Sequence, residues 1–213
     1  MNVRCLWAGA ILGGLAVAQV PLDQEPRHHI EFVNESLRVI SPQIPAGDTT
    51  LEHIHTRDEV TVCIHGSQVR AKQPGRDWSN PGMPCVPGTA GLTEYTGKPR
   101  SHTVQNVGPD VYHLLLVENL RESGWQANDA LADPSLTMVR ENRSFRVYRA
   151  NLAGTTAMVH AHAVPTVVVL VSGQATVGDK QLDEPGRWAL VPAGDKHQIT
   201  ARGEAQLIEI EVR

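Results

Sequence analysis

Residues 47–66 read GDTTLEHIHTRDEVTVCIHG, and residues 154–173 read GTTAMVHAHAVPTVVVLVSG. Both stretches have a glycine at each end and a His-x-His pair at the same place inside, His53-Ile54-His55 and His160-Ala161-His162. Each position of the second stretch lies 107 residues after its counterpart, as 53 and 160 show. An internal repeat of this kind indicates one structural unit built twice, and it decides the architecture we predict.

A second pair of matching positions follows each stretch. His102 lies eleven residues after Gly91, and His197 lies eleven residues after Gly186. Six of the ten histidines therefore occupy equivalent places, which chance would seldom produce. In the first copy 24 residues lie between Gly66 and Gly91, whereas in the second copy 12 residues lie between Gly173 and Gly186. The first copy therefore carries the longer loop.

Local patterning makes both copies β-structured. Residues 167–171 form a short apolar, β-branched run typical of a buried strand, and residues 207–212 largely alternate, as in a strand with one face in water. Residues 175–177 and 180–182 flank Gly178-Asp179, a two-residue turn that favours a hairpin. No window shows helical periodicity beyond two turns. The predicted fold class is all-β, with two antiparallel barrels or sandwiches in tandem.

Composition agrees with this class and narrows the function. The 213 residues are 41% apolar with nine aromatic side chains, and 18 Gly and 14 Pro favour turns over long helices. The net charge of −4, without a basic cluster, argues against a nucleic-acid partner. The sequence has no Gly-x-Ser-x-Gly elbow, phosphate-binding loop or Cys-x-x-Cys pair, so nucleophilic and nucleotide-dependent chemistry have no candidate residues.

The first 18 residues resemble a signal peptide. Arg4 precedes a run of apolar residues and glycine over 5–18, which ends in the small-x-small sequence Ala16-Val17-Ala18. The run is short for a membrane-spanning helix of roughly 20 residues, although a retained N-terminal membrane helix is the alternative. We predict cleavage after Ala18 and export to the periplasm or the extracellular space, with no stable membrane anchor afterwards.

Export would place the remaining cysteines in an oxidising compartment. Cleavage removes Cys5 and leaves Cys63 and Cys85, which could then pair in a disulfide. The alternative is that Cys63 is a buried, inert thiol, because it lies in the apolar run 60–64.

The first histidine pair predicts a metal site. Side chains alternate along a strand, so His53 and His55 point the same way, and Glu59 follows after another even step. His102 would close the site from a distant strand. Three imidazoles and one carboxylate leave two positions of an octahedron free for water or substrate. A core or surface role explains most lone histidines, but it does not explain a repeated constellation.

These residues resemble the cupin superfamily. Gly47, His53, His55, Glu59 and Gly66 match its first motif at every signature position, and the series Gly186, Pro192, Gly194 and His197 matches its second. The resemblance implies a two-barrel cupin, or bicupin, and is specific for fold rather than activity. Its departures are the altered turn at Gly97 and Pro99, where Pro and then Gly are expected, and Ala201 in place of the last Asn.

The second copy departs more strongly, because Thr166 occupies the carboxylate position. By resemblance, His160, His162 and His197 could still hold a metal, since three-histidine sites occur among cupins. The loss of an anionic ligand should weaken the binding of a divalent cation. The alternative is a structural barrel whose histidines are hydrogen-bonding core residues.

The predicted organisation is a signal peptide over 1–18, an N-terminal barrel over 26–120, a linker over 121–142 and a C-terminal barrel over 143–213. His28 and His29 lie near the mature terminus and are expected to be solvated. The long connection from Gln73 to Pro87 is either a rigid surface loop or a cap over the mouth of the first barrel.

Two classes of function remain. The first is a metal-dependent enzyme, of the dioxygenase or decarboxylase type within the cupins, acting on a small organic molecule. The second is a non-catalytic cupin that binds or stores a metal or a small molecule; a purely structural metal is a third reading. Iron or manganese is the expected ion, with nickel, copper and zinc open, because the same ligands accept all of them. Assembly into a homo-oligomer is a further expectation from the resemblance.

Overall fold

The computed structural model describes residues 19–121, 129–154 and 157–213. The described residues form strands joined by turns, with one 3-10 turn, η1 (Leu22–Gln24), as their helical element. The predicted all-β class is confirmed. In these ranges no helix has the length and hydrophobicity needed to span a bilayer. The predicted signal peptide lies outside the described residues.

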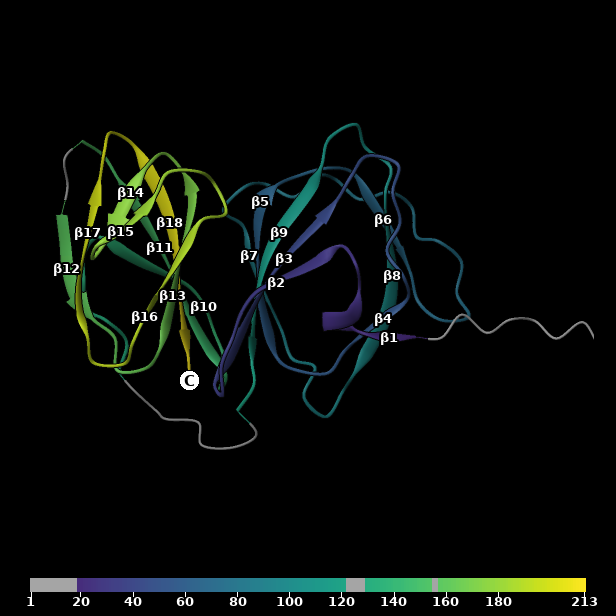
Figure 1. Cartoon of the computed structure of the whole chain (residues 1–213), viewed down its shortest axis with the longest axis horizontal. Helices are drawn as coiled ribbons and strands as arrows, with labels where there is room; N and C mark the ends of the chain where they lie inside the picture. The colour runs from purple at the N-terminus through teal and green to yellow at the C-terminus, as the bar shows by residue number, and fades with distance from the viewer. Residues whose placement is uncertain (1–18, 122–128, 155–156) are drawn as a thin grey trace, which may run out of the picture.

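Strands β1 to β9 form two sheets that face each other (Figure 1). The five-stranded sheet has the order β2-β3-β9-β5-β7 and consists of His28–Val33, Leu37–Ile44, Tyr112–Asn119, Glu59–His65 and Ala90–Thr93. The four-stranded sheet has the order β1-β4-β8-β6 and consists of Val20–Pro21, His53–His55, Arg100–Asn106 and Val69–Lys72. We call this pair of sheets the first unit.

Strands β10 to β18 repeat the arrangement as a second unit. The five-stranded sheet has the order β10-β11-β18-β13-β16 and consists of Leu136–Glu141, Phe145–Leu152, Ala205–Val212, Thr166–Ser172 and Trp188–Val191. The four-stranded sheet has the order β12-β17-β14-β15 and consists of Ala157–Ala161, Lys196–Ala201, Ala175–Val177 and Lys180–Leu182. The two five-stranded sheets thus share one topology, and the expected hairpin about Gly178 joins β14 to β15. Strand β10 lies in the stretch that the sequence predicts as a linker.

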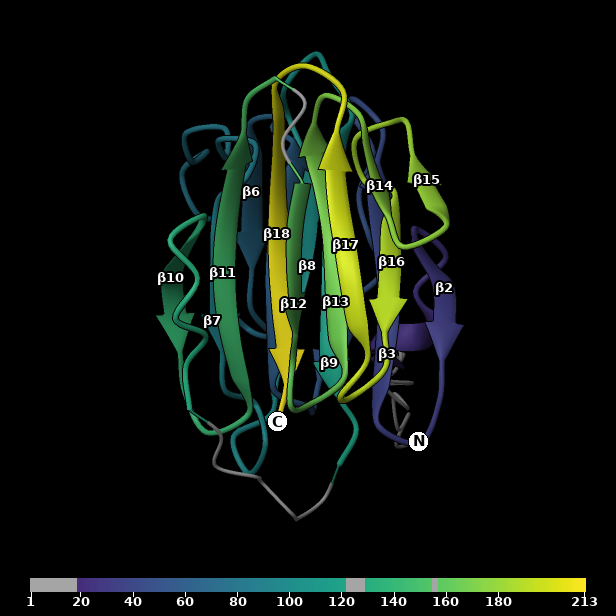
Figure 2. The ribbon, with the colours of Figure 1, turned by 90° about the vertical axis from the view of Figure 1, so that its left-hand side faces the viewer.

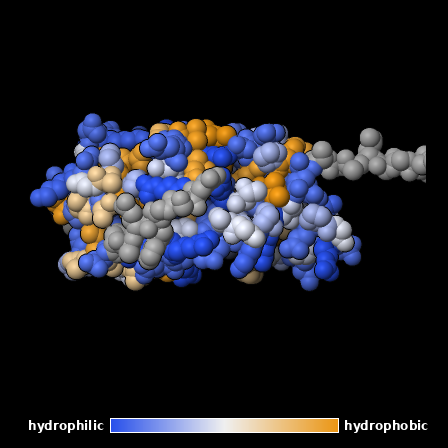
Figure 3. Space-filling model, turned by 90° about the horizontal axis from the view of Figure 1, so that it is seen from below, coloured by the Kyte–Doolittle hydropathy of each residue, from blue (hydrophilic) through white to orange (hydrophobic). Residues whose placement is uncertain are grey.

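A shared hydrophobic core joins the two units. The alternation of β13 explains its apolar run, because Val168 and Leu170 pack inside the second unit while Val167 and Val169 pack against the first. The joint core also takes in Val60 and other buried side chains from β3, β5, β9, β11 and β18. Figures 1 and 2 show the two five-stranded sheets lying against each other, with the four-stranded sheets outside. Polar residues cover most of the face in Figure 3, and hydrophobic ones form small patches among them.

Strand β18 differs from its prediction. The sequence predicts that one face of 207–212 meets water, yet Glu209 and Glu211 are both 0% exposed. Both glutamates lie on the face of the strand that points into the second unit, where they form ion pairs with a histidine and an arginine. The alternation of residues correctly predicts which side chains share a face. The prediction that the charged face meets water was wrong, because it rested on the polarity of the side chains alone.

Candidate metal centres

The first cluster lies where β4 and β8 pair. His53 and His55 share one face of β4, and His102 on β8 lies directly opposite His53 in the register. One nitrogen from each of the three rings lies within 4.8 Å of the other two. Because a metal–nitrogen bond is about 2.0–2.1 Å long, nitrogens at this spacing can share one ion.

Hydrogen bonds fix two of these rings. His53 Nδ1 lies 2.9 Å from the carbonyl oxygen of Leu51, and His55 Nδ1 lies 2.8 Å from Glu59 Oε2. Both partners only accept hydrogen bonds, so each Nδ1 carries the proton and each Nε2 keeps its lone pair. His55 Nε2 then lies 3.2 Å from Nε2 of His102. This is the tautomer that a metal ligand requires.

Glu59, the carboxylate that the sequence predicts as a ligand, lies behind His55. Its second oxygen is 3.4 Å from the Thr61 hydroxyl, and its side chain is buried. Glu59 lines the same cavity as the three histidines but is outside the group whose ligand atoms converge. The structure therefore brings the four predicted residues to one place and gives the carboxylate the position of an acceptor that orients His55.

His28 joins this site from the N-terminal segment, contrary to the expectation that it is solvated. Strand β1 pairs in parallel with β4, and η1 then turns the chain back, so His28 is only 8% exposed. Its ring meets that of His53 edge-on with centroids 4.7 Å apart, and its Nδ1 lies 3.1 Å from the carbonyl oxygen of Leu22. Position near a predicted mature terminus gave no sign of this packing. His29 is exposed, as expected.

Two rings of the first cluster, and that of His28 beside them, are neutral at neutral pH. Burial, followed by the neighbouring histidines, lowers the pKa of His28 and His102 to about 3. Burial also lowers the pKa of His53 to about 4. A metal ion can therefore bind these rings without displacing a proton, because neutral imidazole is the ligating form.

A cavity of about 310 Å³ adjoins the three histidines. Glu59, Thr61 and Tyr95 line it with polar groups, and the rest of its wall is mostly aliphatic. Burial, and then the charge of Glu59, raise the pKa of Tyr95 to about 12, so its hydroxyl stays protonated. The Tyr95 ring lies 4.8 Å from that of His55.

The long connection 73–87 runs beside β6. Backbone amides of Ser79 and Gly82 donate to β6, and a disulfide joins Cys63 to Cys85. Gly66 is required at this crossing, because a β-carbon there would overlap the carbonyl oxygen of Cys85. Part of the connection, around Arg76, borders an opening that also includes His102. The segment is thus a surface loop held by hydrogen bonds and a disulfide, and it also lines the opening that leads to the first cluster.

The second cluster repeats the strand geometry. His160 on β12 lies opposite His197 on β17, and His162 directly follows β12. Glu209 on β18 completes the group, and the four ligand atoms lie within 4.8 Å of one another. Glu209 Oε2 is 2.9 Å from His160 Nε2 and 2.8 Å from His162 Nε2. All four side chains are buried, and Nε2 of His197 has no hydrogen-bond partner, which marks a place for a ligand.

Glu209 is the residue that the sequence reasoning missed. Thr166, at the motif's carboxylate position, donates instead to the carbonyl oxygen of Val164, 3.1 Å away. In the registers, Thr166 pairs with Glu211 as Glu59 pairs with Glu118. Two residues earlier, Glu209 in the second unit therefore corresponds to Leu116 in the first. The signal was present as two glutamates on one face of an otherwise apolar strand.

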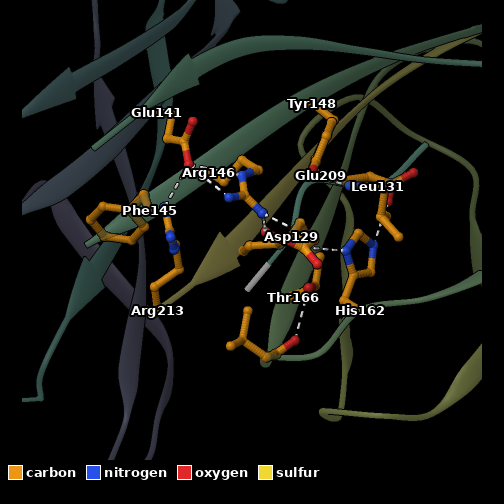
Figure 4. A network of polar contacts seen from close by, with 12 residues as sticks. Asp129, Leu131, Glu141, Phe145, Arg146, Tyr148, His162, Thr166, Glu209 and Arg213 are labelled. Carbon is orange, nitrogen blue, oxygen red and sulfur yellow. Dashed lines mark hydrogen bonds and ion pairs between the residues drawn. The ribbon is translucent and has the colours of Figure 1, made fainter. Parts of the chain in front are cut away.

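Glu211 orients the second cluster. Its Oε1 lies 2.9 Å from His162 Nδ1, so a carboxylate fixes the second histidine of the pair in both units, although from different strands. The other oxygen of Glu211 is 3.2 Å from Arg146, which Glu141 also contacts (Figure 4). The first unit has a similar buried pair, Arg38 and Glu118, 3.3 Å apart.

The second cluster carries balanced charges. Burial opposes ionisation, but hydrogen bonds from His160 and His162 outweigh it and lower the pKa of Glu209 to about 2. Likewise, hydrogen bonds to Glu209 and Glu211 overcome burial and raise the pKa of His162 to about 9. Before a metal can bind, His162 must therefore release a proton.

No protein-family model and no curated protein sequence matches this chain, but many solved structures resemble it, and three of them are described below. Salicylate 1,2-dioxygenase from Pseudaminobacter salicylatoxidans has 12% identity and a TM-score of 0.62, covering 85% of this chain and 72% of its own. AerE from Microcystis aeruginosa has 9% identity and a TM-score of 0.58, covering 89% and 98%. YhhW from Escherichia coli has 14% identity and a TM-score of 0.56, covering 87% and 89%. The chain has the fold of the cupin superfamily.

Proposed function

We propose that this chain is a metal-dependent bicupin enzyme that acts on a small organic molecule at the first cluster, by oxidative cleavage or decarboxylation. One observation carries the proposal: three imidazoles converge on the wall of a cavity large enough for a small substrate. The fold of a salicylate 1,2-dioxygenase, and a structure of a variant of that enzyme in complex with gentisate, support the oxidative class.

The donor set fits a divalent transition metal. His53, His55 and His102 would hold the ion, with Glu59 fixing the ring of His55. Iron or manganese is the ion we propose, since three imidazoles with open positions suit both. When bound, such an ion supplies a Lewis acid and, with iron or manganese, one-electron chemistry.

The residues around the ion have distinct tasks. The aliphatic walls exclude water and bring the substrate close to the three nitrogens. The Tyr95 hydroxyl, protonated at neutral pH, is a neutral hydrogen-bond donor beside His55. Part-exposed His102 borders both the cavity and the outer opening, so the substrate would enter past its ring.

Elemental analysis and oxygen uptake test this proposal. The His102→Ala variant should lose the redox-active ion of the first cluster, together with oxygen uptake on a panel of phenols and organic acids. The matched variant His197→Ala, at the equivalent strand position, should keep both. Metal that stays bound without turnover on any substrate would favour the alternative, a cupin that binds or stores its ligand.

For the second cluster we propose a structural metal centre formed by His160, His162, His197 and Glu209. Four protein ligands, all buried, correspond to a closed site such as structural zinc uses. The lone Nε2 of His197 supports an ion there, because burial without any partner is costly. Chelation should then lower the melting temperature of wild-type protein but leave oxygen uptake of a reloaded first site unchanged.

We also propose export of the chain. The predicted signal peptide over 1–18 motivates it, and the Cys63–Cys85 disulfide supports it, because such bonds persist in oxidising compartments. Cell fractionation of the full-length chain, with mass spectrometry of its N-terminus, tests both points. Full-length protein in the cytoplasm, with Cys63 and Cys85 as free thiols, would contradict them.

A further inference from the structure

The cavity beside the first cluster has a mostly apolar wall. Aliphatic and tyrosine side chains make up most of its lining, and none of the lining residues, all of them described, is a lysine or an arginine. The apolar and tyrosine part of the lining includes Ile44, Val69, Val104, Tyr112, Leu114 and Leu116. Apart from the histidines and the two tyrosines, Glu59 is the one lining residue with an ionisable side chain, and it is an acid.

Strand alternation keeps the two cations of β6 out of the cavity lining. On β6, Val69 and Ala71 line the cavity, while Arg70 and Lys72 lie outside it over the ring of Trp78. Lys72 borders the outer opening, as Arg76 does. Arg70 and Lys72 lie 4.9 and 5.2 Å from the centre of that ring. The sequence of this strand thus separates an apolar inner face from a basic outer one.

Size limits the ligand further. The cavity of about 310 Å³ is roughly twice the ~150 Å³ engineered cavity that holds one benzene ring. One substituted ring or a chain of similar size fits beside an ion. A carboxylate buried on such a wall would lose its hydration and find no lysine or arginine among the lining residues, and it would also lie near the carboxyl group of Glu59.

We propose that the first cavity selects a small, largely apolar molecule that is uncharged apart from the oxygen atoms that meet the metal. This rests on the proposed metal centre, which supplies the positive charge for those oxygens. Neutral catechols and enols belong to the class; rings with a carboxylate away from the metal-binding oxygens do not. The cavity wall, rather than the metal, then sets the specificity.

Two probes with the same metal-binding hydroxyls test the wall. 4-Methylcatechol and 3,4-dihydroxybenzoate differ in a methyl group against a carboxylate at the far side of the ring. Calorimetry with the zinc-loaded full chain, which cannot turn over either probe, should give at least ~30-fold tighter binding of 4-methylcatechol. Equal or tighter binding of the benzoate would overturn the proposal. Metal analysis before and after each titration shows that zinc is retained.

Two substitutions locate the effect. Val69→Lys adds a cation to the wall and should reduce the preference about tenfold, whereas Val69→Met, neutral and of similar length, should leave it unchanged. Arg76 borders the outer opening rather than the cavity, so Arg76→Gln should also change nothing. Loss of benzoate binding in Arg76→Gln would place the carboxylate at the mouth and overturn the proposal.

The metal-free chain separates this inference from the proposed function. If the first cluster retains no zinc, the proposed metal centre fails, and toluene against benzoate is then measured on metal-free protein. Preferential binding of toluene would still support a neutral ligand, because the wall acts without the ion. Preferential binding of benzoate would overturn the inference whatever the metal result.

Discussion

In the first unit His102 is part-exposed and borders a cavity, whereas its counterpart His197 is buried in a group of four ligands. The strands that carry these histidines pair in the same register in both units. The units differ at one position of the last strand beside these rings, which is Leu116 in the first unit and Glu209 in the second. Leucine leaves room and an apolar wall, while glutamate fills the same space with a fourth ligand atom.

The carboxylates that orient the rings have moved as well. His55 is held by Glu59 from β5, and His162 is held by Glu211 from the neighbouring strand β18. The requirement for an acceptor behind the second histidine is met in both units, although Thr166 has replaced the motif residue. A duplicated framework can therefore keep its ring geometry while its ligand number, charge and access change independently.

Glu209→Leu should have the largest effect, because it gives the second unit the residue of the first. Removal of one partner from a buried charged group costs about 3–5 kcal/mol, so the melting temperature of the metal-free protein should fall. The same variant should bind metal at the second cluster more than ~100-fold more weakly, as judged by competition with a chelator. A variant with unchanged metal content and stability would remove Glu209 from the ligand set.

The two units also differ in their loops. Among the described residues, the disulfide Cys63–Cys85 is the only one, and it ties down the longer connection of the first unit. It closes a loop over a sequence separation of 22 residues, which corresponds to about 3 kcal/mol of stability. The Cys63→Ser, Cys85→Ser double variant should lose about that much in urea unfolding. Its metal content at the second cluster should be unchanged, and a loss there would mean that the loop supports both units.

Leu116→Glu is the reverse exchange, and it should convert the open site toward a closed one. The added carboxylate would lie near the three histidines, so metal affinity of the first cluster should rise about tenfold. Binding of 4-methylcatechol should fall, because the new side chain occupies part of the cavity. Leu116→Gln, of the same size but uncharged, controls for lost space: it should weaken the probe without tightening the metal.

Much of this site could be predicted from the sequence, because it depends on local spacing. His53 and His55 share a face by strand periodicity, and the repeat identified His160, His162, His197 and His102. Glu209 could not be found in this way, since its partners are 47 and 49 residues away and its strand suggested a solvated edge. His28 was missed for a similar reason: its burial depends on the pairing of β1 with β4, which no local pattern encodes. The fold followed from periodicity, whereas residues brought in by long-range pairing required the structure.

Acidity should act in opposite directions on His53 and His102 of the first cluster and on His162 of the second in metal-free protein. The pKa values of His53 and His102 are about 4 and 3 in the folded state, so below about pH 6.5 the unfolded chain takes up protons that the folded chain does not. Stability should fall with pH in that window by on the order of 1 kcal/mol per pH unit for each ring. The pKa of His162 is about 9, so its contribution is complete below about pH 6.5 and is lost as the pH rises through 9. Urea unfolding at pH 4.5, 6.5 and 9 measures both effects. His102→Gln should reduce the loss of stability between pH 6.5 and 4.5, because one of the contributing rings is gone, and His162→Gln should reduce the loss between pH 6.5 and 9.

His28→Asn should have the smallest effect and gives the most direct test of the ligand count in the first unit. His28 meets His53 through a ring edge, and its Nδ1 is occupied by the carbonyl of Leu22. A residue that only positions a ligand should change metal affinity by about tenfold or less, and exposed His29→Asn should not change it at all. A loss as large as that of His102→Ala would make His28 a fourth ligand. The first site would then have four protein ligands as the second does, and the contrast in ligand number between the two units would disappear, leaving the cavity as the remaining difference.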